Sequence, residues 1–198
     1  ALARQREAAE LAGEGLLLEL PAAREPLPAA APLPLLPGFL ERDSTRADYG
    51  TRDLRAGFSV ELWLRLTSLD PGQVLLDSRG PDGAGFCLHM SSGGAVEIIL
   101  NDGRTENRWA CDPGLLAAGA AHHLVAVVDG GPKIISFVVD GRLNDGGDAR
   151  QFGWGRYSAA LRGVGGTALR IGAAVLGVRL YGRALLTSEA VAAYRKGL

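Results

Sequence analysis

The chain has 198 residues, which is enough for one sandwich-sized domain with a hydrophobic core. Its formal net charge is −1, so it lacks the basic excess with which proteins bind polyanions, and nucleic acid is a poor partner. Hydrophobic residues make up 47% of the sequence and 28 residues are glycine, a composition that suits short strands separated by turns. No apolar run approaches the roughly 20 residues that a membrane-spanning helix needs.

The first residues have the pattern of a short helix. Apolar and charged residues interleave with helical spacing over residues 1–12, and Gly13 and Gly15 interrupt the pattern. We therefore interpret residues 1–14 as a connecting helix or linker. They do not resemble a signal peptide, because charges run through them and no apolar central stretch follows. We expect either that a signal has been removed or that the chain is a piece of a longer polypeptide.

A proline-rich segment follows at residues 21–37, which hold six of the ten prolines. Proline removes backbone donors from a sheet and favours extended geometry. The leucines between these prolines make the segment too apolar for a solvated linker. We expect an ordered strap that crosses the surface of the domain. The alternative is a proline-rich ligand for an aromatic-lined groove.

Residues 58–67 (FSVELWLRLT) alternate apolar and polar side chains more cleanly than any other stretch, which predicts a strand. One face is wholly apolar and must point into a core: Phe58, Val60, Leu62, Leu64 and Leu66. Trp63 points the opposite way, beside Glu61 and Arg65. That second face is either an exposed sheet surface or one covered by the terminal segments, and we expect the strap to cover it.

Two β-branched, apolar runs at residues 123–128 and 133–139 are separated by Asp-Gly-Gly-Pro. Val, Ile and Phe favour strands, and the intervening residues force a reversal, so the pair predicts a β-hairpin. Both faces of each strand are mostly apolar. The hairpin should therefore lie centrally in its sheet and be covered on both sides.

The whole pattern predicts an all-β fold, a two-sheet antiparallel sandwich or jelly roll with short helices at the termini. Turn signals separate about twelve short strands, and almost no helix lies between them. A final helix begins at Thr187, where Thr187 or Ser188 caps the amides and Glu189 lies near the positive end. The remaining predicted strands cover residues 15–20, 39–43, 47–51, 73–78, 85–91, 95–101, 104–111, 168–172 and 175–180.

The two cysteines, Cys87 and Cys111, lie on the first and third strands of a predicted meander. Tight turns place Cys87 opposite Ile99 and Ile99 opposite Glu106, so Cys111 lies two strands away and further along. Two strands alone separate Cα atoms by roughly 9–10 Å. A disulfide needs Cα atoms within about 7 Å. We therefore predict two unpaired thiols.

Four stretches in order resemble the laminin G-like jelly-roll modules of the concanavalin A-like lectin/glucanase superfamily. They match the family patterns F-S/T-V-E-x-W, W-H-H-V-A-V-x-x-D-G (with Ala121 where an aromatic is common), I-x-L-Y-V-D-G-x-L and R-I-Y-N-R-A-L-S-x-E-E-I. The stretches are GFSVELWLRL at residues 57–66, AHHLVAVVDG at 121–130, ISFVVDGRL at 135–143 and VRLYGRALLTSEAVAAYRKG at 178–197.

The resemblance implies a laminin G-like domain over residues 15–198, with the strap included. Such modules are typically appended to secreted enzymes that act on polysaccharides, or to surface adhesins. We therefore expect a non-catalytic carbohydrate-binding or accessory module at the C-terminal end of a secreted glycan-processing enzyme, extracellular or periplasmic. Its expected partners are a polysaccharide or oligosaccharide and an upstream catalytic domain. The alternative is a structural or protein-interaction module that buttresses a neighbouring domain.

Catalysis by the chain itself is disfavoured. Glucanases of this fold carry a Glu-x-Asp-x-x-Glu pattern whose carboxylates flank the glycosidic bond, and no such pattern occurs here. His122 and His123 begin a core strand, where neighbouring side chains face opposite sides. We expect one of them to be packed and hydrogen-bonded and the other to lie at the surface.

A sugar site needs an aromatic plate for the apolar face of a pyranose and polar groups for its hydroxyls. The loop at residues 150–157 and the strand around Trp109 supply both. The candidates for carbohydrate binding are Trp154, Tyr157, Arg150, Arg156, Trp109 and Asn107. The alternative is that Trp154 fills the end of the sandwich and its glycine neighbours let the loop fold over it. An exposed Trp154 or Trp109 beside Arg or Asn favours sugar binding, whereas burial of both favours the structural role.

The resemblance also suggests calcium as a second ligand. Hard cations take six to eight oxygen ligands, often from carboxylates in a loop. Asp145 and Asp148 lie in a glycine-rich turn and are weak candidates, and Asp43 and Asp48 are another pair. Ordinary turn chemistry explains both pairs equally well, because Asp and Gly dominate turns.

Overall fold

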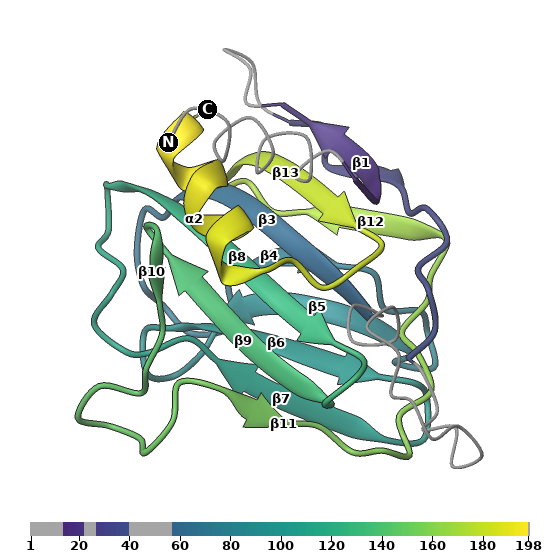
Figure 1. The fold of residues 1–198 in the computed structure, drawn as a ribbon. Coiled ribbons are helices and arrows are strands. Elements are labelled where there is room, and N and C mark those ends of the chain that lie inside the picture. Colours follow the sequence, from purple (N-terminus) through teal and green to yellow (C-terminus); the bar gives the residue numbers. More distant parts are fainter. Residues whose placement is uncertain (1–13, 22–26, 40–56, 198) are drawn as a thin grey trace.

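The computed structural model describes residues 14–21, 27–39 and 57–197. Within these ranges the strands form two antiparallel sheets stacked face to face (Figure 1). Sheet A contains, in spatial order, β1 (Leu16–Leu20), β13 (Val175–Tyr181), β3 (Gly57–Arg65), β8 (Ala121–Asp129), β9 (Ile134–Val139) and β10 (Arg142–Leu143), with β11 (Gly155–Arg156) pairing with another part of β9. Sheet B contains β2 (Ala30–Pro32), β12 (Ala168–Ile171), β4 (Val74–Asp77), β5 (Gly85–Met90), β6 (Val96–Asn101) and β7 (Glu106–Ala110). The predicted two-sheet sandwich is confirmed.

The core lies between the two sheets and is set by alternation along β3. The five apolar residues at alternate positions from Phe58 to Leu66 are fully buried in one cluster. They pack against apolar residues of sheet B, among them Phe86, Leu88 and Ile98. The predicted inner face of this strand is therefore confirmed.

The outer face of sheet A, which is turned away from sheet B, is covered by helix α2 (Thr187–Lys196), and Figure 1 shows the helix lying across it. Trp63 stacks on Tyr194 of this helix, with ring centroids 6.2 Å apart. Within the described residues, the main cover of Trp63 is therefore the C-terminal segment and not the expected proline-rich strap. Among the described strap residues only Pro21 lines a cavity with Trp63, and Ala30–Pro32 pairs with β12 of sheet B instead.

A buried carboxylate fixes the strands beneath the helix. Glu61 accepts hydrogen bonds from His123 (3.1 Å), Arg179 (3.0 Å) and Tyr181 (2.8 Å), which lie on β8 and β13. Burial raises the pKa of Glu61, but the hydrogen bonds from His123 and Tyr181 and the charge of Arg179 outweigh it, so its pKa lies below its usual value. Glu61 is therefore an ionised structural anchor.

Both neighbouring histidines are buried, so the expectation that one lies at the surface is wrong. His123 contacts Glu61, as described. His122 has its Nδ1 atom 2.7 Å from Asp140, and its Nε2 atom accepts a hydrogen bond from the Ala117 amide. Both nitrogens of the His122 ring thus have partners, and the His123 ring is held through its Nε2 atom by Glu61, which offsets part of the cost of burying these rings.

The predicted central hairpin is confirmed as β8 and β9, which pair in antiparallel register from Leu124↔Val139 to Asp129↔Ile134. Its inward side chains join the main core. Its outward side chains form a second apolar cluster under α2 that includes Val125, Val127 and Val138. The hairpin is therefore covered on both sides, as its sequence predicts.

The meander of β5, β6 and β7 differs from the prediction in one register. Cys87 lies opposite Ile99, as expected, but Ile99 lies opposite Arg108 and not Glu106. The reason is that residues 102–105 form the connection in place of a two-residue turn, with the Asp102 carboxylate accepting amide hydrogen bonds. Cys87 and Cys111 are both buried and unpaired, as predicted, and burial raises the pKa of each thiol to about 11.

The ends of the described chain deviate from the prediction in small ways. Helix α2 is capped at Leu186, not at Thr187 or Ser188, and the Glu189 carboxylate accepts a hydrogen bond from the Leu186 amide at 2.7 Å. The predicted helix over residues 1–12 lies outside the described residues. So do residues 40–43 and 47–51 of two predicted strands, with Asp43 and Asp48.

Two leucines test the assignment of core and surface. Leu62→Ala should reduce the free energy of unfolding by about 2–5 kcal/mol, because Leu62 is fully buried and its removal leaves a cavity. Leu35→Ala should change it by less than about 0.5 kcal/mol, because Leu35 is 92% exposed. Urea unfolding measures both values, and equal losses would contradict the assignment.

Candidate functional site

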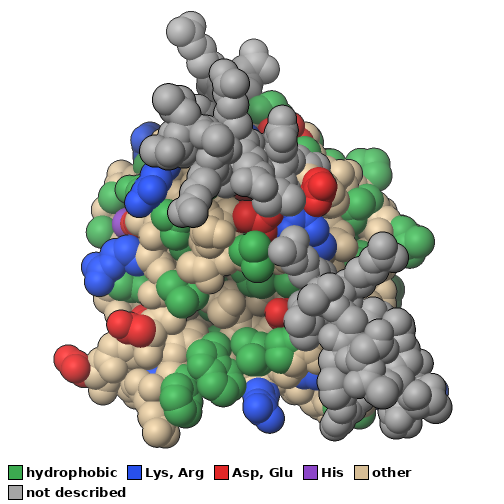
Figure 2. Space-filling view, in the orientation of Figure 1, with side chains coloured by type: hydrophobic (Ala, Val, Ile, Leu, Met, Phe, Trp, Pro, Cys, Tyr) green, Lys and Arg blue, Asp and Glu red, His purple; other side chains and the backbone are tan. Residues whose placement is uncertain are grey.

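The segment from Phe152 to Tyr157 alternates between outward and inward residues. Phe152, Trp154 and Arg156 are exposed, whereas Gly153, Gly155 and Tyr157 are buried. Phe152 is 49% and Trp154 37% exposed, and their rings stack with centroids 5.0 Å apart. Figure 2 shows hydrophobic side chains gathered along the lower edge of the view, over β11 and the loop before it. We call Phe152, Trp154 and Arg156 the loop surface.

Trp109, on β7, anchors this loop to the sandwich. Its indole N–H donates a hydrogen bond to the Gly153 carbonyl at 3.3 Å. The backbone of Gly155 lies directly on the indole, since a Cβ atom there would meet the Trp109 ring at 2.3 Å. Trp109 is therefore covered by its own loop and presents no free plate to a ligand.

Arg150 also holds the loop in place. Its guanidinium lies over the Trp109 ring, 4.4 Å from the centroid, pairs with Asp112 and donates to the Ala110 carbonyl. Burial raises the pKa of Asp112, but the hydrogen bonds from Arg150 and Gly146 outweigh it and bring the pKa below its usual value. This ion pair fastens the loop to the end of β7 and leaves Arg150 engaged within the protein.

Asn107 and Tyr157 likewise face inward. The Asn107 side-chain oxygen accepts a hydrogen bond from the Ser158 amide at 3.0 Å. Tyr157 is buried against Phe39, donates a hydrogen bond to the Asp129 carbonyl, and has its pKa raised by burial. Of the six sequence candidates, only Trp154 and Arg156 lie on the exposed loop surface.

The calcium candidates Asp145 and Asp148 do not form a metal site with other side chains in the described part of the chain. Asp145 and Asp148 are exposed, and Asp145 accepts a hydrogen bond from the Gly147 amide, which is ordinary turn geometry. In the parts of the chain that the structure describes, no group of three or more His, Cys, Asp or Glu side chains is arranged to hold a metal ion.

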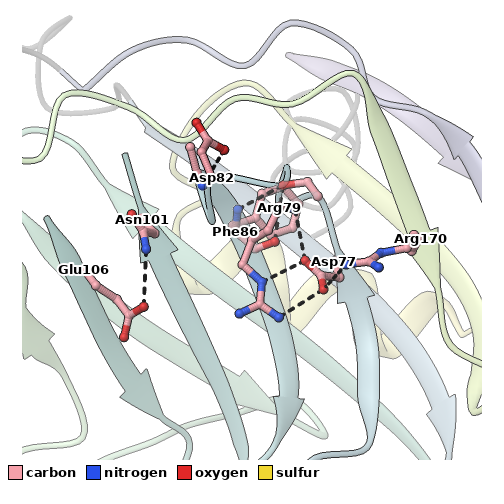
Figure 3. Close-up of polar contacts among 9 residues, drawn as sticks. Asp77, Arg79, Asp82, Phe86, Asn101, Glu106 and Arg170 are labelled. Carbon is pink, nitrogen blue, oxygen red and sulfur yellow. Dashed lines mark hydrogen bonds and ion pairs between the residues drawn. The ribbon is translucent and has the colours of Figure 1, made fainter. Parts of the chain in front are cut away.

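A second polar surface lies on the outer face of sheet B. Figure 3 shows Arg79 and Arg170 converging on the Asp77 carboxylate. The Arg79 guanidinium donates two hydrogen bonds to Asp77, at 2.9 and 3.0 Å, and that of Arg170 donates one at 2.5 Å. Burial raises the pKa of Asp77, but the hydrogen bonds and charge of Arg79 and the charge of Arg170 outweigh it and bring the pKa below its usual value.

The charges of this face compensate one another. Beside the Asp77 cluster, Arg108 pairs with Glu106 and lies 3.7 Å from Glu97, and His89 lies 3.0 Å from Glu97. Three guanidinium groups thus face three carboxylates, and each guanidinium already contacts at least one of them. The face offers hydrogen-bonding groups but little net charge to attract an ion.

Sequence reasoning missed two parts of these surfaces. Phe152 was not among the candidates, although the alternation F-G-W-G-R-Y indicates that it shares a face with Trp154 and Arg156. The Asp77 cluster had no local signal, because Arg170 is 93 positions away and reaches Asp77 through the pairing of β12 with β4. Among the described residues, no helix has the length and apolarity to cross a membrane.

The sequence matches a family model of the laminin G type, described as the concanavalin A-like lectin/glucanases superfamily, over residues 43–191. The match covers more than half of the chain. No curated protein matches the sequence.

Solved structures with a similar fold share little sequence with this chain. The CBM40 of the Ruminococcus gnavus IT-sialidase, bound to α2,3 sialyllactose, aligns with a TM-score of 0.57 and 15% identity over 91% of this chain and 99% of that one. The same CBM40 bound to α2,6 sialyllactose aligns with a TM-score of 0.55 and 15% identity, over 90% of this chain and 98% of that one. The binding domain of botulinum neurotoxin DC in complex with SialylT aligns with a TM-score of 0.53 and 10% identity, over 70% of this chain and 35% of that one. At such identities the likeness establishes the fold alone.

Replacing Asp77 tests the charged face. Asp77→Asn should lower the free energy of unfolding at neutral pH by about 1–3 kcal/mol, because two guanidinium groups lose their carboxylate. Since the folded pKa of Asp77 is depressed, its stabilisation is present above the unfolded value of about 4 and is lost as the pH falls through the folded value. The variant should therefore lose less stability between neutral and acidic pH than the wild type. Urea unfolding at both pH values measures this, with the exposed Asp148→Asn as control; equal behaviour of the two variants would contradict it.

Gly155→Ala tests the contact between the loop and the Trp109 ring. The added methyl group would lie 2.3 Å from the Trp109 ring, so the loop must shift, at a cost of about 1–3 kcal/mol. Gly165→Ala is the matched control, because a Cβ atom there meets nothing within 4 Å. Thermal unfolding and tryptophan fluorescence check both changes, and an undisturbed Gly155→Ala variant would refute the contact.

Proposed function

Because the chain belongs to the concanavalin A-like lectin/glucanases superfamily, we propose that it is a non-catalytic carbohydrate-binding module. The observation that carries the proposal is the exposed, stacked pair Phe152 and Trp154, held in place by the loop that Trp109 and Arg150 anchor. Large aromatic side chains are normally packed inside a protein, so two neighbouring exposed rings on a firmly seated loop suit a binding surface.

The physical basis is the complementarity between a flat aromatic ring and the apolar face of a pyranose. Each ring buries a large apolar area and has a negatively polarised face that attracts the partly positive C–H groups of a sugar. Arg156, on the same side of the segment, supplies donors for sugar oxygens. A rigid platform of this kind loses little conformational entropy when the ligand binds.

The ligand class is an oligosaccharide or polysaccharide. Support for trying short sialylated glycans first comes from the neighbouring folds, two of which are described with sialyllactose and one with SialylT.

The non-catalytic role is supported by the placement of the acidic residues. Glu61, Asp77, Asp112 and Glu189 are buried, and each is bound by arginine or histidine side chains within the protein. A glycosidase needs two carboxyl groups that flank an accessible sugar bond. These four carboxylates serve as structural anchors.

We further propose that the module belongs to a secreted glycan-processing enzyme and works outside the cell or in the periplasm, beside a catalytic domain. This rests on the usual setting of such modules and on the neighbouring CBM40, which by its name is part of a sialidase. A calcium requirement at Asp145 and Asp148 is tested in the same experiment.

Trp154→Ala should lower glycan affinity by roughly 10- to 100-fold, because an aromatic anchor in a binding surface contributes about 1.5–3 kcal/mol. Phe152→Ala should have a smaller effect in the same direction. The measurement is binding of the full chain to an array of plant, microbial and sialylated glycans, with and without calcium.

Leu35→Ala is the control, since it removes an exposed apolar side chain from the strap and leaves the loop unchanged. Far-UV circular dichroism confirms that each variant is folded. Binding that survives in Trp154→Ala would exclude the loop surface as the site. No binding to any glycan by the wild type would refute the proposal and favour a module that buttresses its neighbouring domain.

A further inference from the structure

Arg156 is the charged member of the loop surface. Gly155 faces inward onto Trp109, so Trp154 and Arg156, the residues on either side of it, point outward together. In an extended chain, residues two apart are separated by roughly 6.6 Å along the strand. A guanidinium group on its flexible stem can therefore reach the rim of a sugar ring that stacks on Trp154.

Among the residues that the structure describes, no acidic side chain pairs with Arg156. Within residues 14–21, 27–39 and 57–197, its guanidinium forms no ion pair or hydrogen bond, although its backbone pairs with Ile134 in the sheet. Arg150, six positions earlier, is by contrast committed to Asp112 and Trp109. The cation beside the aromatic pair is thus open to an external partner.

The charged face of sheet B is a poorer place for an anion. Its arginines Arg79, Arg108 and Arg170 already contact Asp77, Glu97 or Glu106. An incoming carboxylate would have to compete with these internal partners. At Arg156 it would displace only water.

We propose that the loop surface is selective for an acidic sugar, and that Arg156 is the residue that confers this selectivity. The inference rests on the proposed function and adds the ligand class. The ring of the sugar packs on Trp154 and Phe152, while its carboxylate accepts hydrogen bonds from the Arg156 guanidinium. Planar guanidinium and carboxylate groups bind through two parallel hydrogen bonds, which orients the ring as well as attracting it.

The test compares α2,3-sialyllactose with lactose, which lacks the acidic sugar, by calorimetry or NMR titration of the full chain. The wild type should bind sialyllactose more tightly by on the order of three- to tenfold, as expected for one exposed charge-assisted contact. The preference should shrink as salt rises from about 50 to about 500 mM, since salt screens exposed charges. Arg156→Gln should remove the preference by weakening sialyllactose binding much more than lactose binding, and Arg156→Lys should keep part of it.

Arg104→Gln is the matched control, because it removes the same charge from an exposed position in the connection between β6 and β7. This variant should keep the full preference. Equal affinity of the wild type for both sugars, or a preference that survives in Arg156→Gln, would overturn the assignment while leaving carbohydrate binding intact. Failure of the wild type to bind either sugar, with binding to a neutral polysaccharide in the array, would also overturn it. Failure to bind any glycan would overturn the proposed function as well.

Discussion

The central strands of sheet A, β3 and β8, are buried on both faces, and the arrangement of layers in the molecule follows from this constraint. The inward side chains of β3 are apolar and need only a second sheet. Its outward side chains include Glu61 and Trp63, which need specific partners when they are covered. His123, Arg179 and Tyr181 meet the carboxylate, and Tyr194 of α2 stacks on the indole. The C-terminal helix is thereby fixed to the outer face of sheet A.

Local patterns in the sequence were enough to predict the sandwich. The strands at residues 58–67, 123–128 and 133–139 match β3, β8 and β9 closely, because alternation and turn residues act over a few positions. Two features needed information that no local pattern contains. The register of β6 and β7 depended on whether the connection at 102–105 has two or four residues. Trp63 is covered by a helix more than a hundred positions away, although the strap is nearer in sequence.

The candidate site was predictable in part. Composition located the segment around Trp154, since aromatic and arginine residues are concentrated there. Composition does not distinguish inward from outward side chains, so Tyr157 and Asn107 looked equivalent to Trp154. The role of Trp109 depended on the tertiary approach of Gly155 to its ring, which the structure alone reveals. The Asp77 cluster is assembled by strand pairing across long sequence distances and is invisible to any short motif.

The alternation along residues 152–157 separates the side chains that hold the loop on the sandwich from those that face the solvent. Gly153, Gly155 and Tyr157 carry the contacts with the sandwich, and none of them faces the solvent. Phe152 and Trp154 carry the exposed surface, and their rings stack on each other. Side chains at the outward positions can therefore be exchanged without refolding the domain, whereas the inward positions tolerate almost no added volume. One scaffold of this design can diverge toward new ligands through a few outward substitutions, with the stability of the fold insulated from the change.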